Sequence, residues 1–344
     1  FCDATESQLI ISDNSKDKFK NDFWSKIKIN KLNYSIYDDN VHKNFSGWYN
    51  LYNASKRTRS DFICFLSDDD LILDIYTSSI NYKDISEDVV AIKPVIRSWH
   101  IDCGFYHNNS FTIDGDTASE RISQYLEKCN GSNTSLFSFV KSKIWLDLME
   151  LSLCHPTKGG YSDWAFVLGI VSSGKVIHDS SKLLIYKNDK WFDEKENIHN
   201  RTVELYKNAG LDKRSESFSN LFQGLDSLIY IMRKSSPVNR EELALVSKKY
   251  LLRQIKNLFQ RYINKKSDFT KEEASMICNL LKVDHIDNAE NNILRVMSYT
   301  PEEFTLENML FQCLDLISIH CSKLTDPYKE FYKASLENDW GKID

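Results

Sequence analysis

Three consecutive aspartates, Asp68, Asp69 and Asp70, are the side chains of this sequence best suited to chemistry. They follow Ser67 and an apolar run over residues 62–66, which has the length and composition of a strand buried on both faces in the centre of a parallel sheet. Adjacent carboxylates repel one another, and a divalent cation such as Mg²⁺ or Mn²⁺, which prefers oxygen ligands, would neutralise them. In open α/β sheets, ligands bind outside the carboxyl ends of the strands. The pattern therefore favours a metal site, and an acidic turn that caps the next helix is the alternative.

The elements around the aspartates follow an α/β pattern. We expect strands at 32–36, 89–96, 135–140 and 175–178, and helices at 44–59, 116–128, 143–153 and from Ser162 or Asp163 to a C-capping Gly174. Residues 99–117 show no clear periodicity and are expected to form a loop. Residues 1–7 read as the tail of a buried strand, so we expect that the sequence before Phe1 was removed or belongs to another piece. This succession predicts an α/β domain over residues 1–200.

The remainder of the chain is helical in pattern. We expect helices at 217–233, 240–264, from 268, at 286–297, from 300, at 309–317 and at 328–336, which together predict an all-α domain over residues 201–344. After Arg240, the segment 240–266 carries seven further basic residues interleaved with apolar ones, namely Lys248, Lys249, Arg253, Lys256, Arg261, Lys265 and Lys266. They form either a solvent-exposed helix face, with the apolar residues packed in the core on the other side, or a surface that attracts an anionic membrane.

Composition narrows the class of protein. With 344 residues, 42% hydrophobic and 27% charged residues, and a net charge of −5, the chain reads as a globular protein without the basic field of a nucleic-acid partner. The eight cysteines are scattered, without a Cys-x-x-Cys pair, which predicts reduced thiols in the cytoplasm. No apolar run reaches the ~18 residues of a membrane span, so we expect at most peripheral attachment at the inner face of the cell membrane. Motifs of serine hydrolases, phosphate-binding loops and dinucleotide-binding folds are missing.

Several of these segments together resemble a glycosyltransferase family 2 domain of GT-A fold. They are the stretch Cys2-Asp3-Ala4-Thr5-Glu6-Ser7, the run 62–66 with Ser67-Asp68-Asp69-Asp70, and the Gly-rich loop followed by Asp163-Trp164. A bacterial subgroup with an Asp-Asp-Asp sequence also has a Ser-Glu-Arg helix, here Ser119-Glu120-Arg121. The resemblance covers roughly residues 1–190, and Ser67 stands where the family has the first Asp of its Asp-x-Asp motif.

The resemblance implies a metal-dependent, inverting transfer of a sugar from a nucleotide-diphosphate sugar, with a UDP-linked donor expected, to a surface glycan or a lipid-linked acceptor. It implies that Asp69 and Asp70 bind Mn²⁺ or Mg²⁺, which bridges the two phosphates of the donor. Asp68 would face the ribose or water, Asp3 would bind the nucleobase, and Trp99 would offer its face to a sugar ring.

The resemblance also implies that Asp163 is the general base that takes the proton from the acceptor hydroxyl. For each residue a structural interpretation stays open: a helix N-cap for Asp163, a turn for Asp3 and a core position for Trp99. His178 is either a further metal ligand or a structural histidine. Two other functions also stay open, a nucleotidyltransferase that uses the same carboxylates and a non-catalytic interaction protein whose helical half is the binding module.

Overall fold

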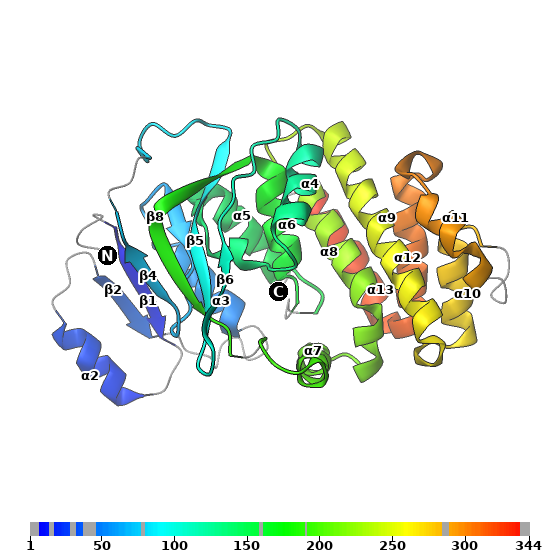
Figure 1. Cartoon of the computed structure of the whole chain (residues 1–344), viewed down its shortest axis with the longest axis horizontal. Coiled ribbons are helices and arrows are strands. Elements are labelled where there is room, and N and C mark those ends of the chain that lie inside the picture. Colours follow the sequence, from blue (N-terminus) through cyan, green and yellow to red (C-terminus); the bar gives the residue numbers. More distant parts are fainter. Residues whose placement is uncertain are drawn as a thin grey trace. The chain divides into compact units, whose positions relative to one another are not determined.

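The computed structural model describes residues 7–13, 17–27, 32–36, 46–76, 80–157, 161–189, 191–283 and 289–337 (Figure 1). Asp3 and the paired glycines Gly159 and Gly160 lie outside the described residues. The chain is mixed α/β, with a curled mixed sheet and many helices. It forms two compact units that alternate along the sequence: the first is Phe1–Asp114, Glu127–Leu153 and Gly174–Asp189, and the second is Gly115–Leu126, Cys154–Ser173 and Lys190–Asp344. The division into an α/β domain over residues 1–200 and an all-α domain over residues 201–344, which rests on the sequence pattern, stays a prediction.

The first unit is built on a six-stranded sheet. Its strands are β3 (Phe62–Cys64), β4 (Leu71–Asp74), β5 (Val89–His100), β6 (Gly104–Asn109), β7 (Phe139–Lys141) and β8 (Lys175–Lys187). Their order is β3-β7-β5-β8-β4, and β6 pairs with β5 beside this path. The β5–β8 pair is parallel and the other pairs are antiparallel. Because β3 and β5 both run opposite to β7, the strands β3, β5 and β8 point the same way.

The prediction of a central buried strand at 62–66 is wrong. Within the described part of the chain, β3 has three half-buried residues and pairs with β7 alone. The physical reason is that Phe65 leaves the strand and packs as part of a loop. Its ring stacks on Phe137 and Trp145, with centroid distances of 5.7 and 6.5 Å, so the apolar run belongs partly to a strand and partly to a core contact.

The first unit also holds a smaller parallel sheet of β1 (Leu9–Asp13) and β2 (Leu32–Ile36), with α2 (Lys18–Lys26) between them in sequence. Helix α3 (Ser46–Ser55) packs on α5 (Ser142–Leu153), where the buried Trp145 indole donates to Ser55 Oγ at 2.8 Å. The predicted loop at 99–117 contains β6, which starts at Gly104, with a φ of 71°, and runs back along β5.

The second unit is helical. It contains most of α4 (Ala118–Lys128), α6 (Asp163–Ser173), α7 (Lys195–Asn208), α8 (Ser219–Met232), α9 (Arg240–Asn264), α10 (Lys271–Leu280), α11 (Ile293–Ser298), α12 (Leu306–Cys321) and α13 (Thr325–Glu337). Helices α8, α9, α12 and α13 lie side by side around a shared apolar core (Figure 1). Among the described helices, none combines the length and the apolarity needed to cross a bilayer. The seven cysteines within the described ranges are free thiols.

Candidate functional site

The acidic turn, defined as Ser67-Asp68-Asp69-Asp70, joins β3 to β4. These strands stand at opposite ends of the strand order, so the link that carries the turn passes from one edge of the sheet to the other. A hydrogen bond of 3.2 Å from Asp70 N to Ser67 O closes the turn. The turn follows the carboxyl end of β3, which runs parallel to β5 and β8, and this is the end of the strands at which α/β sheets bind ligands.

Asp70 is the most constrained carboxylate of the turn. Its Oδ1 accepts a hydrogen bond of 2.9 Å from the backbone N–H of Lys187, at the end of β8. Its Oδ2 is buried and has no hydrogen-bond partner in the described part of the chain. Burial raises the pKa of Asp70, and the charge of Asp69 adds to this rise, whereas hydrogen bonds from Lys187 and Ser67 oppose it. One oxygen is therefore fixed by the fold, and the other is buried without a hydrogen-bond partner among the described residues.

Trp99 is paired with the same end of β8 to which Asp70 is bound. In the parallel register Trp99 pairs with Lys187, and the next residue, Asn188, donates its N–H to Trp99 O at 2.9 Å. Trp99 is half-buried, while Asp68 and Asp69 are exposed on the turn. The fold thus brings the predicted metal residues and the predicted sugar-facing tryptophan to one end of the sheet through the far end of β8, of which the sequence predicted only the first residues, 175–178.

The carboxylates of the turn suit a hard cation held jointly with a phosphate ligand. In the described ranges, no three His, Cys, Asp or Glu side chains are grouped closely enough to hold a metal ion by themselves. Mg²⁺ and its analogues need only one or two carboxylates when substrate phosphates and water complete the shell. The exposed Asp69 and the unpartnered oxygen of Asp70 meet that requirement.

His178 lies away from the acidic turn. Its Nδ1 is 3.0 Å from the carbonyl oxygen of Lys93, with which it is paired in register. Lys93 precedes Trp99 by six residues on β5, a separation of ~20 Å at ~3.3 Å per residue. The structure therefore separates His178 from the predicted metal residues, and its structural interpretation is favoured.

Lys93 itself is a fully buried amine. Among the described residues no group accepts a hydrogen bond from its Nζ, which lies 4.9 Å from the centroid of the Phe111 ring. Burial lowers the pKa of Lys93 to about 7. No motif points to this residue, although it sits within the apolar run of β5, where both faces of the strand are covered.

Asp163 belongs to the second unit, where it is the first residue of α6. The carbonyl oxygen of Ser162 accepts the hydrogen bond from Phe166 N at 3.0 Å, which makes Ser162 the N-cap residue and places Asp163 in the first turn. Asp163 is half-exposed, and the positive end of the helix dipole favours its ionised form.

Two buried arginines hold the other end of α6. Arg121 donates its Nε to Val171 O at 3.0 Å and an Nη to Ser172 O at 2.8 Å. Arg233 donates to Gly169 O at 3.3 Å and to the Ser173 hydroxyl at 2.7 Å. Cations at the carboxyl end of a helix satisfy its last carbonyls and complement its dipole, so this pair fixes the helix that carries Asp163 at its start.

The Ser119-Glu120-Arg121 motif thereby receives structural roles. Glu120 and Thr117 form a capping box at the start of α4, with hydrogen bonds of 3.0 and 3.2 Å. Lys249 of α9 donates to the Ser119 hydroxyl at 3.0 Å. Together with the Arg121 contacts, these bonds tie α4 to α6 and α9 within the second unit.

A buried polar network anchors the segment that leads to α6. His155 Nε2 lies 3.1 Å from Asp226 Oδ2, an ion-pair distance without good hydrogen-bond alignment. The Tyr328 hydroxyl donates to the other Asp226 oxygen at 3.0 Å, and Thr157 N donates to His155 Nδ1 at 3.2 Å. His155 and Asp226 are both nearly inaccessible, so the network connects this segment to α8 and α13 and has no access to a substrate.

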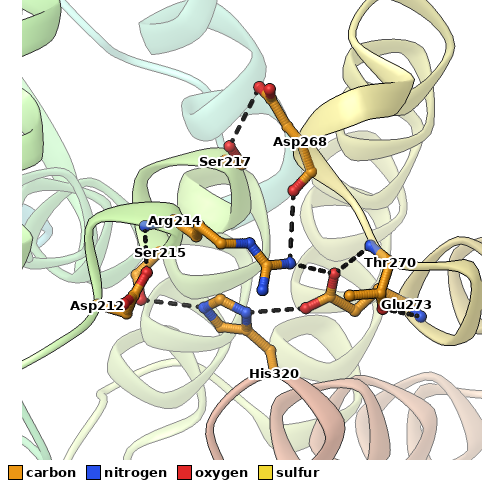
Figure 2. Close-up of polar contacts among 8 residues, drawn as sticks. All are labelled: Asp212, Arg214, Ser215, Ser217, Asp268, Thr270, Glu273 and His320. Carbon is orange, nitrogen blue, oxygen red and sulfur yellow. Dashed lines mark hydrogen bonds and ion pairs between the residues drawn. The ribbon is translucent and has the colours of Figure 1, made fainter.

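Figure 2 shows a further polar cluster, in which a serine, a histidine and a glutamate stand in the order of a hydrolase triad. Ser215 Oγ is 3.0 Å from His320 Nε2, and His320 Nδ1 is 3.1 Å from Glu273 Oε1. Ser215 is fully buried, and the His320 ring stacks on Phe218 at a centroid distance of 4.0 Å. An acyl substrate has no route to the serine, so we interpret the arrangement as structural.

The same cluster links three chain segments (Figure 2). Arg214 reaches Glu273 Oε2 at 2.5 Å and the Asp268 carbonyl at 3.5 Å, while Asp212 caps Arg214 N at 2.8 Å. Glu273 also completes a capping box with Thr270. The cluster therefore joins the segment before α8 to the start of α10 and the end of α12.

A polar hollow of about 480 Å³ lies on the surface of the second unit. Its lining residues come from α7, α9 and the segments beside them: His199, Glu216, Asn257, Gln260, Arg261, Asn264 and Lys265. The three amide residues are spaced to lie on one face of α9. Arg261 pairs with Glu216 inside the hollow, so the amides and Lys265 are the groups best placed to bind a polar or anionic ligand.

Several of the basic residues of the segment 240–266 are engaged within the second unit. Lys256 donates to the carbonyls of Met297 and Tyr299 at 2.9 and 2.6 Å, and Lys266 pairs with Glu290 at 2.7 Å. With the Lys249 and Arg261 contacts described above, these favour the structural interpretation of this basic face. Attraction of the helix to an anionic membrane stays a prediction.

The contacts that prediction missed leave weak traces in the sequence. Lys187 acts on Asp70 through its backbone N–H, which every residue except proline has.

No protein-family model matches the chain, and no curated protein matches it at a significant level.

Proposed function

We propose that this protein is a metal-dependent, inverting glycosyltransferase whose first unit is GT-A-like. It would move a sugar from a nucleotide-diphosphate sugar, with UDP as the expected nucleotide, to a glycan or lipid-linked acceptor. The observation that carries the proposal is the state of Asp70 at the acidic turn. One of its oxygens is fixed by Lys187, and the other is buried without a partner in the described part of the chain, at the carboxyl ends of parallel strands.

The proposed roles follow the chemistry of the donor. Asp69 and Asp70 would hold Mn²⁺ or Mg²⁺, which supplies charge stabilisation to the leaving diphosphate when it is bound. Trp99, at the same end of β8, would offer its ring to a sugar, and the exposed Asp68 would face the ribose or water. Asp163 would act as the general base on the acceptor hydroxyl, as the sequence resemblance implies.

The test is the mutual stabilisation of protein, metal and nucleotide. Mn²⁺ and UDP together should raise the melting temperature of the wild type more than either alone, because each binds only the folded state. Asp69→Asn keeps the shape of the side chain but removes the ligand charge, and should abolish the joint effect. Asp61→Asn changes an exposed aspartate just before β3 and serves as the matched control.

Activity gives the second readout. Release of nucleoside diphosphate from a panel of nucleotide sugars should require the metal and should fall by orders of magnitude in Asp69→Asn. Retained release in that variant would refute the metal role. No release of nucleoside diphosphate from nucleotide sugars, together with release of pyrophosphate from nucleoside triphosphates in a parallel assay, would identify the nucleotidyltransferase alternative, which uses the same carboxylates.

The polar hollow supports a second candidate, in which the helical unit binds a polar or anionic ligand without catalysis. Asn257, Gln260 and Asn264 offer amide groups on one face of α9, where they line this open surface hollow. If Mn²⁺ and UDP give no joint stabilisation but acidic oligosaccharides bind, and Asn257→Ala with Asn264→Ala weakens that binding, this candidate replaces the enzyme.

A further inference from the structure

Helix α2 exposes two phenylalanines on one face. Phe19 is 77% exposed and Phe23 is 50% exposed. Residues four apart on a helix are neighbours on its surface, so the two rings belong to one patch. Single exposed apolar residues are common, but two phenylalanines one turn apart on a nine-residue helix form a feature that needs a partner.

The attachment of α2 explains why these rings face outward. Trp24 is half-buried and stacks on Tyr34 of β2, with ring centroids 6.1 Å apart and an interplanar angle of 23°. The Tyr34 hydroxyl donates to Asp13 Oδ2 of β1 at 3.0 Å. The helix is therefore fastened to the small sheet through Trp24. Phe23 packs the edge of its ring on Trp24, with centroids 5.3 Å apart, and half of Phe23 and most of Phe19 remain exposed.

The segment that contains α2 is strongly basic. Residues 16–31 hold six lysines and two aspartates, a formal charge of +4 in a chain whose total is −5. Lys20 and Lys26 are exposed on the helix itself. Along the sequence, positive charge is therefore concentrated in the segment that also carries the two exposed phenylalanines.

We propose that α2 is a membrane-contact surface that binds anionic bilayers, with Phe19 and Phe23 inserted at the interface and the lysines against the lipid headgroups. A bilayer offers negative charge and hydrocarbon in adjacent layers, which matches this combination of side chains. A nucleic acid or an acidic peptide would satisfy the lysines but leave both phenylalanines in water. The proposal concerns attachment alone and does not depend on the proposed transferase activity.

The test is sedimentation of the full chain with vesicles of neutral lipid and with vesicles containing about one third anionic lipid. The wild type should bind the anionic vesicles and should be released by high salt, because surface attraction is screened within ~3 Å at 1 M. Phe19→Ala with Phe23→Ala should weaken binding about tenfold or more, since the loss removes two inserted rings. Lys20→Glu with Lys26→Glu should remove the preference for anionic lipid.

Matched controls distinguish binding through this surface from nonspecific binding to vesicles. Phe311→Ala changes a phenylalanine that is 53% exposed on α12, and Lys83→Glu changes an exposed lysine outside the segment. Both controls should bind as the wild type does, and all variants should keep its melting temperature because the changed residues are exposed. The proposal is overturned if the wild type ignores both kinds of vesicle, if the α2 variants bind like the wild type, or if the controls lose binding equally.

Discussion

Replacement of Lys93 by methionine should stabilise the protein, by an amount that depends on pH. Lys93 is fully buried, and burial lowers its pKa from 10.5 to about 7. At ~1.36 kcal/mol per pKa unit, the charged amine costs the folded state about 5 kcal/mol. Methionine has a similar length and no charge, so the change should strain the core little.

The sign of the pH dependence follows from proton binding. Between about pH 7 and 10.5 the unfolded chain holds the proton on Lys93 and the folded chain does not. Stability of the wild type should therefore rise with pH in this window, by about 1.4 kcal/mol per pH unit from this group. Below pH 7 both states are protonated, and the full penalty applies. Lys93→Met should lack this pH dependence, so its free energy of unfolding should exceed that of the wild type by about 5 kcal/mol at pH 6 and by little near pH 10.

Urea unfolding at pH 6 and pH 9, followed by tryptophan fluorescence, measures this difference. The wild type, Lys93→Met and the exposed control Lys83→Met should be compared at each pH, so that other titrating groups cancel. Lys83→Met should change the unfolding free energy by less than ~0.5 kcal/mol at both values. An advantage of Lys93→Met that is equal at both pH values, or a loss of stability at pH 6, would refute the reasoning.

Three further predictions concern other parts of the chain. Asp163→Asn should keep the affinity for nucleotide sugar but reduce transfer by ~10²–10⁴-fold if Asp163 is the base; unchanged turnover in a transfer assay would leave it a first-turn residue only. Although burial alone would raise it, hydrogen bonds from His320 and Thr270 lower the pKa of Glu273 to about 2. The lowered pKa of Glu273 therefore contributes ~3 kcal/mol to the free energy of unfolding, and this contribution should be lost as pH falls from 4.5 to 2. In acid unfolding experiments, the stability of Glu273→Gln should not show this decrease. Gly174→Ala should destabilise by ~1–3 kcal/mol in thermal melts because its Cβ would lie 2.4 Å from Asp88 O, whereas the open site of Gly47→Ala should tolerate the change.

Helix ends with side-chain caps could be predicted from sequence. The long helix predicted at 240–264 agrees with α9 at both ends. Its start is marked by Asn239, whose side chain caps the first turn. The expected starts of α4 and α10 are likewise marked by capping boxes. Gly174 is predicted as the C-cap of α6, and it does follow that helix. Its φ angle is not positive, so the glycine is needed for another reason: a Cβ at this position would collide with the carbonyl oxygen of Asp88.

Features that depend on distant pairing could not be predicted. The contact between Asp70 and Lys187 spans 117 positions and uses a backbone donor, so no side-chain pattern records it. Helices α2 and α7 were missed because their apolar residues are too few to give a clear period. The burial of Lys93, in contrast, could have been inferred, because a strand covered on both faces buries whichever residue occupies its middle.

The long separation between Asp70 and Lys187 also has a consequence for the order of events during synthesis. The acidic turn leaves the ribosome early, but β7 and β8, which pair with the strands on either side of it, follow about 70 and 110 residues later. Non-local pairing of this kind delays folding because a long loop must close first. A nascent chain that ends before Lys175 should therefore carry the three aspartates in a solvated, unpaired link, and the buried oxygen of Asp70 should form only when β8 joins the sheet.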